Sequence, residues 1–180
     1  MLHRVEFWSQ MGRRYQKIGC GAASLMMLLR HHREHLPILV PRYDDLCECL
    51  WLTVDPALKG QDRKWGKGAY AIDVQRALDG MRSSKRRIRY ATINDADAGR
   101  AIRRIRTALK FGPVMVAMRG KGFGGLGGHW VVIAGYDSHE FRYLDPQLSH
   151  AEVQCLAMAE FSEHWDGFGF VLRHSCGCAS

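Results

Sequence analysis

The chain has 180 residues, of which 47% are hydrophobic, and carries a net charge of +8 at neutral pH. This composition excludes a disordered protein, and the length suits one domain with a sizeable core over residues 1–180. No stretch approaches the roughly 20 apolar residues of a membrane helix, and the N-terminus lacks the apolar core of a cleavable signal peptide. The positive charge favours acidic partners without choosing among nucleic acid, an anionic membrane face and an acidic protein.

The six cysteines are expected to be free thiols in a reducing compartment, because a chain of this length does not need disulfides to hold its fold. Cys47 and Cys49 could join Cys176 and Cys178 in a four-thiolate zinc site. However, one residue separates each pair, whereas paired zinc ligands are usually at least two residues apart. We therefore expect Cys47 to pack as a small hydrophobe in a helix, and we expect no metal and no other cofactor.

The first half of the chain is predicted to be mainly helical. Apolar residues recur at helical spacing after Cys20, which predicts a helix that ends near His35, before Pro37. Glycine and proline residues then separate shorter elements. These are helices over residues 43–52, 71–81 and 97–111, a strand over residues 86–92 and a surface loop over the turn-rich residues 53–68.

The second half has the patterns of strands. The tight connection at residues 137–139 predicts a hairpin between two of them. Helices followed by an antiparallel sheet indicate an α+β fold. The predicted elements are strands over residues 113–118, 130–136, 140–144 and 169–173, and a helix over residues 157–165.

Basic residues cluster in segments 82–89 and 100–106. We expect both segments to be solvated faces, with a surface for an acidic partner as the alternative. Neither segment has the aromatic interleaving or the zinc-finger spacing of a nucleic-acid reader, so no specific nucleic-acid binding is expected. No membrane association is expected either.

Cys20 stands where the first helix begins, a position that favours a reactive thiol. The unpaired backbone N–H groups and the positive end of the helix dipole stabilise a thiolate there. Gly21, Ala22 and Ala23 keep the first turn narrow, so that other elements can approach it. A buried structural cysteine is the alternative, and this stretch alone does not decide between the two.

A nucleophilic thiolate needs a base, and the base needs an orienting group. Among nine histidines, His129 stands out because it begins a strand after the glycine-rich run at 120–128, which leaves room beside its ring. That run lacks the Lys-Ser/Thr ending of a phosphate loop. The predicted hairpin ends at Asp145, which should therefore face His129 and could fix its tautomer. A surface histidine and a strand-ending aspartate are the alternative.

The chain resembles the papain-like cysteine peptidases in four stretches: GCGAASLMMLL (19–29), ALKFGPVMVAM (108–118), GGHWVVIAGYD (127–137) and FRYLDP (141–146). It is most similar to their compact bacterial branch, which includes the peptidases that remove double-glycine leaders and the secreted effector and toxin proteases. The resemblance covers the Cys20 helix and residues 103–146 well, and residues 36–100 poorly. It implies a papain-like α+β fold, with the nucleophile helix in a helical half and the cleft between that half and a sheet half.

The resemblance implies that Cys20 is the nucleophile, His129 the general base and acid, and Asp145 the orienting residue. It also implies a glutamine shortly before the nucleophile, whose side-chain amide binds the oxyanion together with the backbone N–H of Cys20. Gln16 is the candidate, although the family usually leaves a slightly longer gap than its four residues. Gln10 is too distant along the chain to be an easy substitute.

The resemblance further implies a protein substrate that is cut after small residues, commonly Gly-Gly. The Cys20 thiolate would attack the scissile carbonyl, and water would then hydrolyse the thioester. A narrow cleft would suit small residues. We expect these residues to line it: Gly21, Gly127, Gly128 and Trp130.

Three other functions stay open. The same triad could serve a deamidase, an acyltransferase or a transpeptidase, because what attacks the thioester depends on the cleft. Residues 31–35 match the H-x-x-E-H pattern of zinc peptidases, although they end a helix and no third ligand is evident. A domain that only binds peptides is the third alternative, and it would normally have lost the nucleophile or the base.

We interpret the chain as a free-standing protease of bacterial type, an effector or antibacterial toxin. It is short, basic and without an obvious signal or membrane segment. We expect it to be cytoplasmic when made and to be delivered to another cell without a cleavable signal. Its producer would then make a small inhibitor, an immunity protein, that plugs the cleft.

Overall fold

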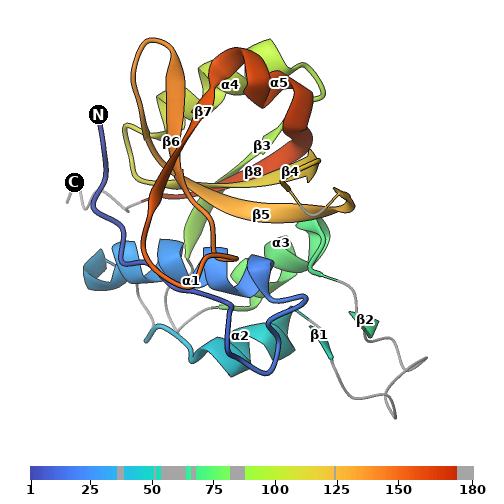
Figure 1. Cartoon of the computed structure of the whole chain (residues 1–180). Helices are drawn as coiled ribbons and strands as arrows, with labels where there is room; N and C mark the ends of the chain where they lie inside the picture. Colours follow the sequence, from blue (N-terminus) through green and yellow to red (C-terminus); the bar gives the residue numbers. More distant parts are fainter. Residues whose placement is uncertain are drawn as a thin grey trace, which may run out of the picture.

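A computed structural model describes residues 1–35, 39–50, 52–53, 64–65, 68–81, 88–123 and 125–173. Most of the predicted loop at 53–68, the basic residues 82–87 and the tail 174–180 with its two cysteines lie outside the described residues. The described part is built around an antiparallel sheet with helices on both faces (Figure 1). None of the helices in these ranges is both long and apolar enough to cross a bilayer.

The main sheet consists of β3 (Arg89–Asn94), β4 (Val114–Gly120), β5 (Gly125–Tyr136), β6 (Glu140–Leu144), β7 (Val153–Ala157) and β8 (Trp165–Arg173). Its spatial order is β3-β8-β4-β5-β6-β7, and every neighbouring pair is antiparallel. The strands from β4 to β7 therefore follow one another across the sheet, whereas β8 returns to lie between β3 and β4. The β5–β6 hairpin predicted from the sequence is present.

The helices lie in two layers, one on each side of this sheet. In Figure 1, α1 runs beneath the sheet with α2 below it, and α4 and α5 cover the upper face. The helices are α1 (Cys20–His31), α2 (Tyr43–Cys49), α3 (Ala71–Gly80), α4 (Ala98–Ala108) and α5 (Met158–His164). A 3₁₀ turn (Arg33–His35) follows α1, and the short strands β1 (Leu52–Thr53) and β2 (Lys64–Trp65) pair in parallel.

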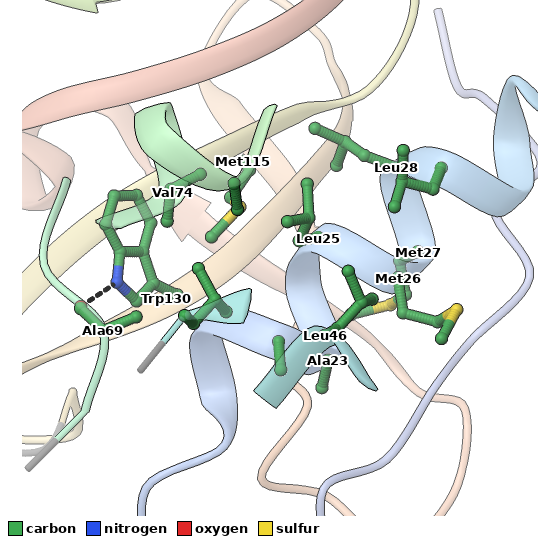
Figure 2. Close-up of a cluster of buried hydrophobic side chains, with 14 of the residues drawn as sticks. Ala23, Leu25, Met26, Met27, Leu28, Leu46, Ala69, Val74, Met115 and Trp130 are labelled. Atoms are coloured by element: carbon green, nitrogen blue, oxygen red, sulfur yellow. Dashed lines mark hydrogen bonds between the residues drawn. The ribbon is translucent and has the colours of Figure 1, made fainter. Parts of the chain in front are cut away.

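Strand alternation fills a separate core on each face of the sheet. In β4, Met115 and Ala117 pack on the α1 side, whereas Val114 and Val116 pack on the side of α4 and α5. Helix α1 is buried from its first residue through Leu29, because the sheet covers one side of it and α2 covers another (Figure 2). This burial explains why its sequence is apolar all around.

The predicted α+β class is confirmed. Most differences lie at the ends of elements, but the short strands β1 and β2, at and within the predicted loop, were not predicted. The helix predicted over residues 43–52 ends at Cys49, and the one after Cys20 ends at His31 before the 3₁₀ turn. Strand β5 begins at Gly125, earlier than predicted, because the glycine run pairs with the end of β4. Strand β7 was not predicted: its sequence, VQCLA, has one buried residue and no apolar alternation.

The first residues of the chain extend the sheet beside β5. Leu2 forms a bridge with Gly135, and the His3 N–H donates to the Ala134 carbonyl at 2.7 Å. A Cβ at Gly135 would lie 2.8 Å from the Leu2 Cα, so the close approach requires glycine. From here the N-terminal segment continues to the region of the candidate site.

Candidate active site

Cys20 is the first residue of α1 and is 8% exposed. Gly19, the N-cap residue, contributes no side-chain oxygen to the first turn. The N–H groups of that turn, and the positive end of the helix dipole, therefore lie beside the Cys20 sulfur without a competing cap. This is the environment that the sequence predicted for a nucleophilic thiol.

Contacts among α1, β5 and the segment before α3 hold the start of α1 against β5. The buried Ser24 hydroxyl donates to the Trp130 carbonyl at 3.0 Å. The Trp130 indole N–H donates to the Ala69 carbonyl at 2.7 Å (Figure 2). Gly21 lies against both partners, since a Cβ there would be 2.9 Å from the Ala69 Cβ and 3.3 Å from the Trp130 ring. Because Gly21 follows the cysteine and Trp130 follows the histidine, these contacts bring the two reactive side chains together.

His129 connects Cys20 to Asp145. Its Nε2 lies 2.7 Å from the Asp145 Oδ1, and its ring lies within hydrogen-bonding reach of Cys20. Since the carboxylate occupies Nε2, the Nδ1 atom is left for the sulfur. The same Asp145 Oδ1 accepts the Gln147 N–H at 2.8 Å, which fixes the carboxylate just after the end of β6. The structure thus brings together the three residues that were predicted as nucleophile, base and orienting group.

The surroundings of His129 favour its protonated form. Burial by itself lowers the pKa of the ring, which is 5% exposed. Hydrogen bonds to Asp145 and Cys20, with the negative charge of both, outweigh burial and raise the pKa of His129 to about 10. A protonated imidazole that lies beside a carboxylate and the Cys20 sulfur can assist nucleophilic attack and then supply a proton to a leaving group.

The other described cysteines are poorly suited to be nucleophiles. Burial raises the pKa of Cys47 to about 12. Burial and nearby carboxylates also raise the pKa of Cys49 at the end of α2. A hydrogen bond to Glu140 raises the pKa of Cys155 on β7. Each of these thiols is therefore mostly protonated at neutral pH.

Two glutamines precede the nucleophile, and Gln10 is the buried one. Its backbone N–H donates to the carbonyl of Pro146, the residue after Asp145, at 2.8 Å. Its Nε2 donates to the Gln16 carbonyl at 2.6 Å, and its Oε1 is buried without a described hydrogen-bond partner. The Gln16 side chain is exposed and accepts the Gly12 N–H. Spacing along the chain pointed to Gln16 and gave no sign that the chain path would bury Gln10 here.

The predicted cleft residues occupy different positions. Gly21 and Trp130 are buried and pack against each other and Ala69. Gly128 is half-buried directly before the histidine and has a φ of +72°, a conformation that favours glycine. The surroundings of Gly127, which also belongs to β5, lie outside the described part.

Gly19 has no room for a side chain. A Cβ there would lie 2.8 Å from the Tyr15 carbonyl oxygen and would overlap the buried Tyr43 hydroxyl. We expect Gly19→Ala to displace the start of α1 and to lower the free energy of unfolding by about 1–3 kcal/mol in urea titrations. Gly80→Ala is the control, because nothing lies within 4 Å of a Cβ at that position. Equal destabilisation by the two substitutions would contradict this explanation.

The H-x-x-E-H segment does not lie on one α-helix. Helix α1 ends at His31, and the 3₁₀ turn carries His35. The His32 ring packs edge-on against His31, with centroids 4.8 Å apart, and lies against Gly112. In the described ranges, no group of three or more His, Cys, Asp and Glu side chains is arranged to hold a metal ion.

No protein-family profile and no curated protein sequence matches the chain. Solved structures do match it. A double glycine motif protease from an AMS/PCAT transporter, crystallised with the leader peptide, aligns with a TM-score of 0.58 and 17% identity over 97% of this chain and 94% of its own. A C39-like peptidase from Bacillus anthracis aligns with a TM-score of 0.66 and 15% identity over 94% of each chain.

The peptidase domain of Streptococcus ComA, a bifunctional ABC transporter of a quorum-sensing pathway, aligns with a TM-score of 0.55 and 17% identity over 87% of this chain and 91% of its own. At these identities the likeness establishes the fold. The chain therefore has the papain-like α+β fold of these peptidases, as the sequence predicted.

Proposed function

We propose that this chain is a cysteine peptidase that cuts a peptide or protein after small residues such as Gly-Gly. One observation carries the proposal: a buried His129 links Cys20, at the start of α1, to Asp145. Solved proteins with this fold include peptidases, which supports the same reaction type. The double-glycine protease crystallised with its leader peptide supports a peptide as the substrate.

The reaction proceeds through a thioester. The Cys20 thiolate attacks the scissile carbonyl carbon, and the oxyanion is stabilised by the Cys20 N–H at the positive end of α1. The His129 imidazolium gives its proton to the leaving amine as the C–N bond breaks. Neutral His129 then takes a proton from water, and the resulting hydroxide attacks the thioester carbon. The C–S bond breaks, which releases the carboxylic acid product and restores the thiolate, while Asp145 keeps the ring oriented.

The preference for small residues rests on the resemblance to the peptidases that remove double-glycine leaders. Gly128 agrees with it, because this half-buried position directly before His129 carries no side chain. Gly21 does not bear on it, since it is buried against Ala69 and Trp130.

We assign the side chain of the oxyanion hole to Gln10 in preference to Gln16, on account of its burial and its contact with Pro146. Gln10→Ala is expected to lower kcat by about 10²–10³-fold with little change in KM, as the loss of an oxyanion donor does. Gln16→Ala is expected to keep most of the activity. The two variants are compared by steady-state kinetics on one internally quenched peptide. A loss of kcat in Gln16→Ala alone would show that Gln16 supplies the side chain of the oxyanion hole.

The proposed function is tested by profiling new N-termini in a bacterial lysate treated with wild-type protein or with Cys20→Ala. We expect new N-termini in the wild-type sample alone, formed after small residues. A sample without new N-termini, from protein whose Cys20 still reacts with iodoacetamide, would refute the peptidase. The same sample would then be searched for the mass changes of deamidation or acyl transfer, because both reactions use the same thioester.

For the role in the cell we propose a bacterial effector or antibacterial toxin, on the strength of the sequence resemblance to such proteases. The net charge of +8 suits an acidic target. Wild-type protein made in the bacterial cytosol is expected to stop growth, Cys20→Ala is not, and a cognate inhibitor protein is expected to restore growth. Normal growth with active enzyme in the cells would contradict this role.

A further inference from the structure

A groove lies between α4, β3 and the end of β8, and we call it the α4 groove. Its cavity volume is about 260 Å³. Ile93, Ala108 and Val171 contribute its apolar lining, and each is nearly inaccessible to solvent. Phe111 also lines the groove, and 51% of this residue is exposed. The groove therefore offers an apolar floor with an aromatic ring at its margin.

The α4 groove is separate from the candidate active site. Its floor belongs to the core on the α4 side of the sheet, whereas α1 packs on the other side. Along the sheet, Val171 pairs with the first residue of β4, Val114. His129 pairs with Met118, near the other end of the same strand. A ligand in the groove would thus be bound on the opposite face and at the opposite strand end from the nucleophile.

Three arginines line the groove: Arg103, Arg104 and Arg173. Arg104 is held in place, because its guanidinium donates to the carbonyls of Thr92 and Asn94 at 3.2 and 3.1 Å. Arg103 and Arg173 are exposed, and no carboxylate among the described residues pairs with either. None of the described residues that line the groove carries a carboxylate, and Arg104 pairs with Asp95 outside this lining at 3.7 Å.

The Phe111 ring and the charge of Arg173 are adjacent. The Arg173 guanidinium lies 5.8 Å from the centroid of the Phe111 ring. A ligand side chain that reached the apolar floor would therefore lie next to Arg173, which has no carboxylate partner among the residues that the structure describes. Arginine binds carboxylates through two parallel hydrogen bonds, which gives such a site directional preference as well as charge.

We propose that the α4 groove binds an acidic peptide segment of a partner protein, with an apolar side chain on the floor and flanking carboxylates on Arg103 and Arg173. The volume is below the roughly 300–1,000 Å³ of small-molecule sites and suits a side chain presented by a peptide. Phosphates of a nucleic acid would engage the arginines but leave the apolar floor empty. This binding does not depend on the proposed peptidase function, because the groove lies away from Cys20.

The test uses full-length Cys20→Ala protein, which keeps the groove and cannot cut the probe. Fluorescence anisotropy would measure the Kd of a fluorescein-labelled peptide, Glu-Glu-Leu-Asp-Phe-Glu-Glu. We expect saturable binding that weakens about tenfold or more when Arg103→Glu and Arg173→Glu are combined. Phe111→Ala is expected to weaken it about fivefold or more, since it removes the apolar contact and leaves the charge unchanged.

Arg14→Glu combined with Lys17→Glu is the matched control, because it makes the same change in net charge in the exposed segment before α1. We expect its Kd to stay near that of the parent. Equal weakening by the two double variants, or no effect of Phe111→Ala, would show that the peptide binds only through non-specific electrostatic attraction. Either result would overturn the proposal. Absence of binding would overturn it too, as would tighter binding of a DNA duplex or of phosphatidylglycerol vesicles that the same groove variants abolish.

Discussion

Cys20→Ala and His129→Ala are each expected to lower kcat/KM for a Gly-Gly peptide by about 10⁴-fold or more, and the double variant is expected to be no worse than either alone. The reason is that the thiolate and the imidazolium form one reacting unit, held within hydrogen-bonding reach in the buried site. Once either member is lost, the remaining one has no partner for proton transfer. Hydrolysis of an internally quenched peptide measures all three variants.

Cys49→Ala is the control for this experiment, because it removes an exposed thiol at the end of α2 that has no part in the proposed triad. Its kcat/KM should equal that of the wild type. Alkylation with iodoacetamide at about pH 6 adds a second measurement: His129→Ala should slow the reaction of Cys20, since the thiolate loses its cationic partner. Multiplicative losses in the double variant would mean that the two residues act independently, and the proposed unit would be refuted.

The positions of the candidate site residues could be predicted in part from local rules. The start of a helix stabilises a thiolate wherever it lies in the fold, so Cys20 could be named as a candidate from its own stretch, although that stretch left a buried structural cysteine as the alternative. The short turn at residues 137–139 sets the hairpin, so His129 and Asp145 had to lie close together. That Cys20 meets this hairpin followed from the resemblance alone. In the structure it depends on contacts of α1 with β5, which are far apart in the sequence.

The features that could not be predicted from the sequence depend on which distant segments of the chain come together in the fold. Gln10 is buried because the N-terminal segment returns to Pro146. Spacing along the chain favoured the exposed Gln16. The α4 groove exists because β8 inserts between β3 and β4, and no local pattern specifies that insertion. Strand β7 forms through its pairing with β6, which overrides a sequence without strand alternation.

Asp145→Ala is expected to move the alkaline limb of kcat/KM to lower pH by about one unit or more. In the wild type, burial lowers the pKa of His129, but hydrogen bonds to Asp145 and Cys20 and their charges raise it to about 10. The protonated ring stabilises the thiolate and protonates the leaving amine, so activity falls as pH rises through that pKa. Removing the carboxylate takes away one raising contribution and leaves burial in place, so the ring loses its proton at a lower pH.

Asp145→Asn separates the charge of this residue from its hydrogen bonds. An asparagine Oδ1 can still accept the His129 Nε2–H and the Gln147 N–H. Because an imidazolium carries a proton on each nitrogen, the amide oxygen can accept without selecting a tautomer. We therefore expect the asparagine variant to show the lowered alkaline limb of the alanine variant. The kcat of the asparagine variant should nevertheless be roughly tenfold or more above that of the alanine variant, because the amide oxygen keeps the His129 ring oriented.

Both variants are measured as kcat/KM and kcat from about pH 5 to 11. Glu152→Gln is the control, because it removes an exposed carboxylate of the same charge and should leave the limb in place. An alkaline limb that stays or rises in both Asp145 variants would show that this carboxylate does not hold His129 protonated. Equal kcat in the two Asp145 variants would instead show that this residue does not orient the His129 ring. The experiment thus separates two contributions of the Asp145 side chain. Its charge sets the pH at which kcat/KM falls, and its hydrogen bonds set the maximum value of kcat.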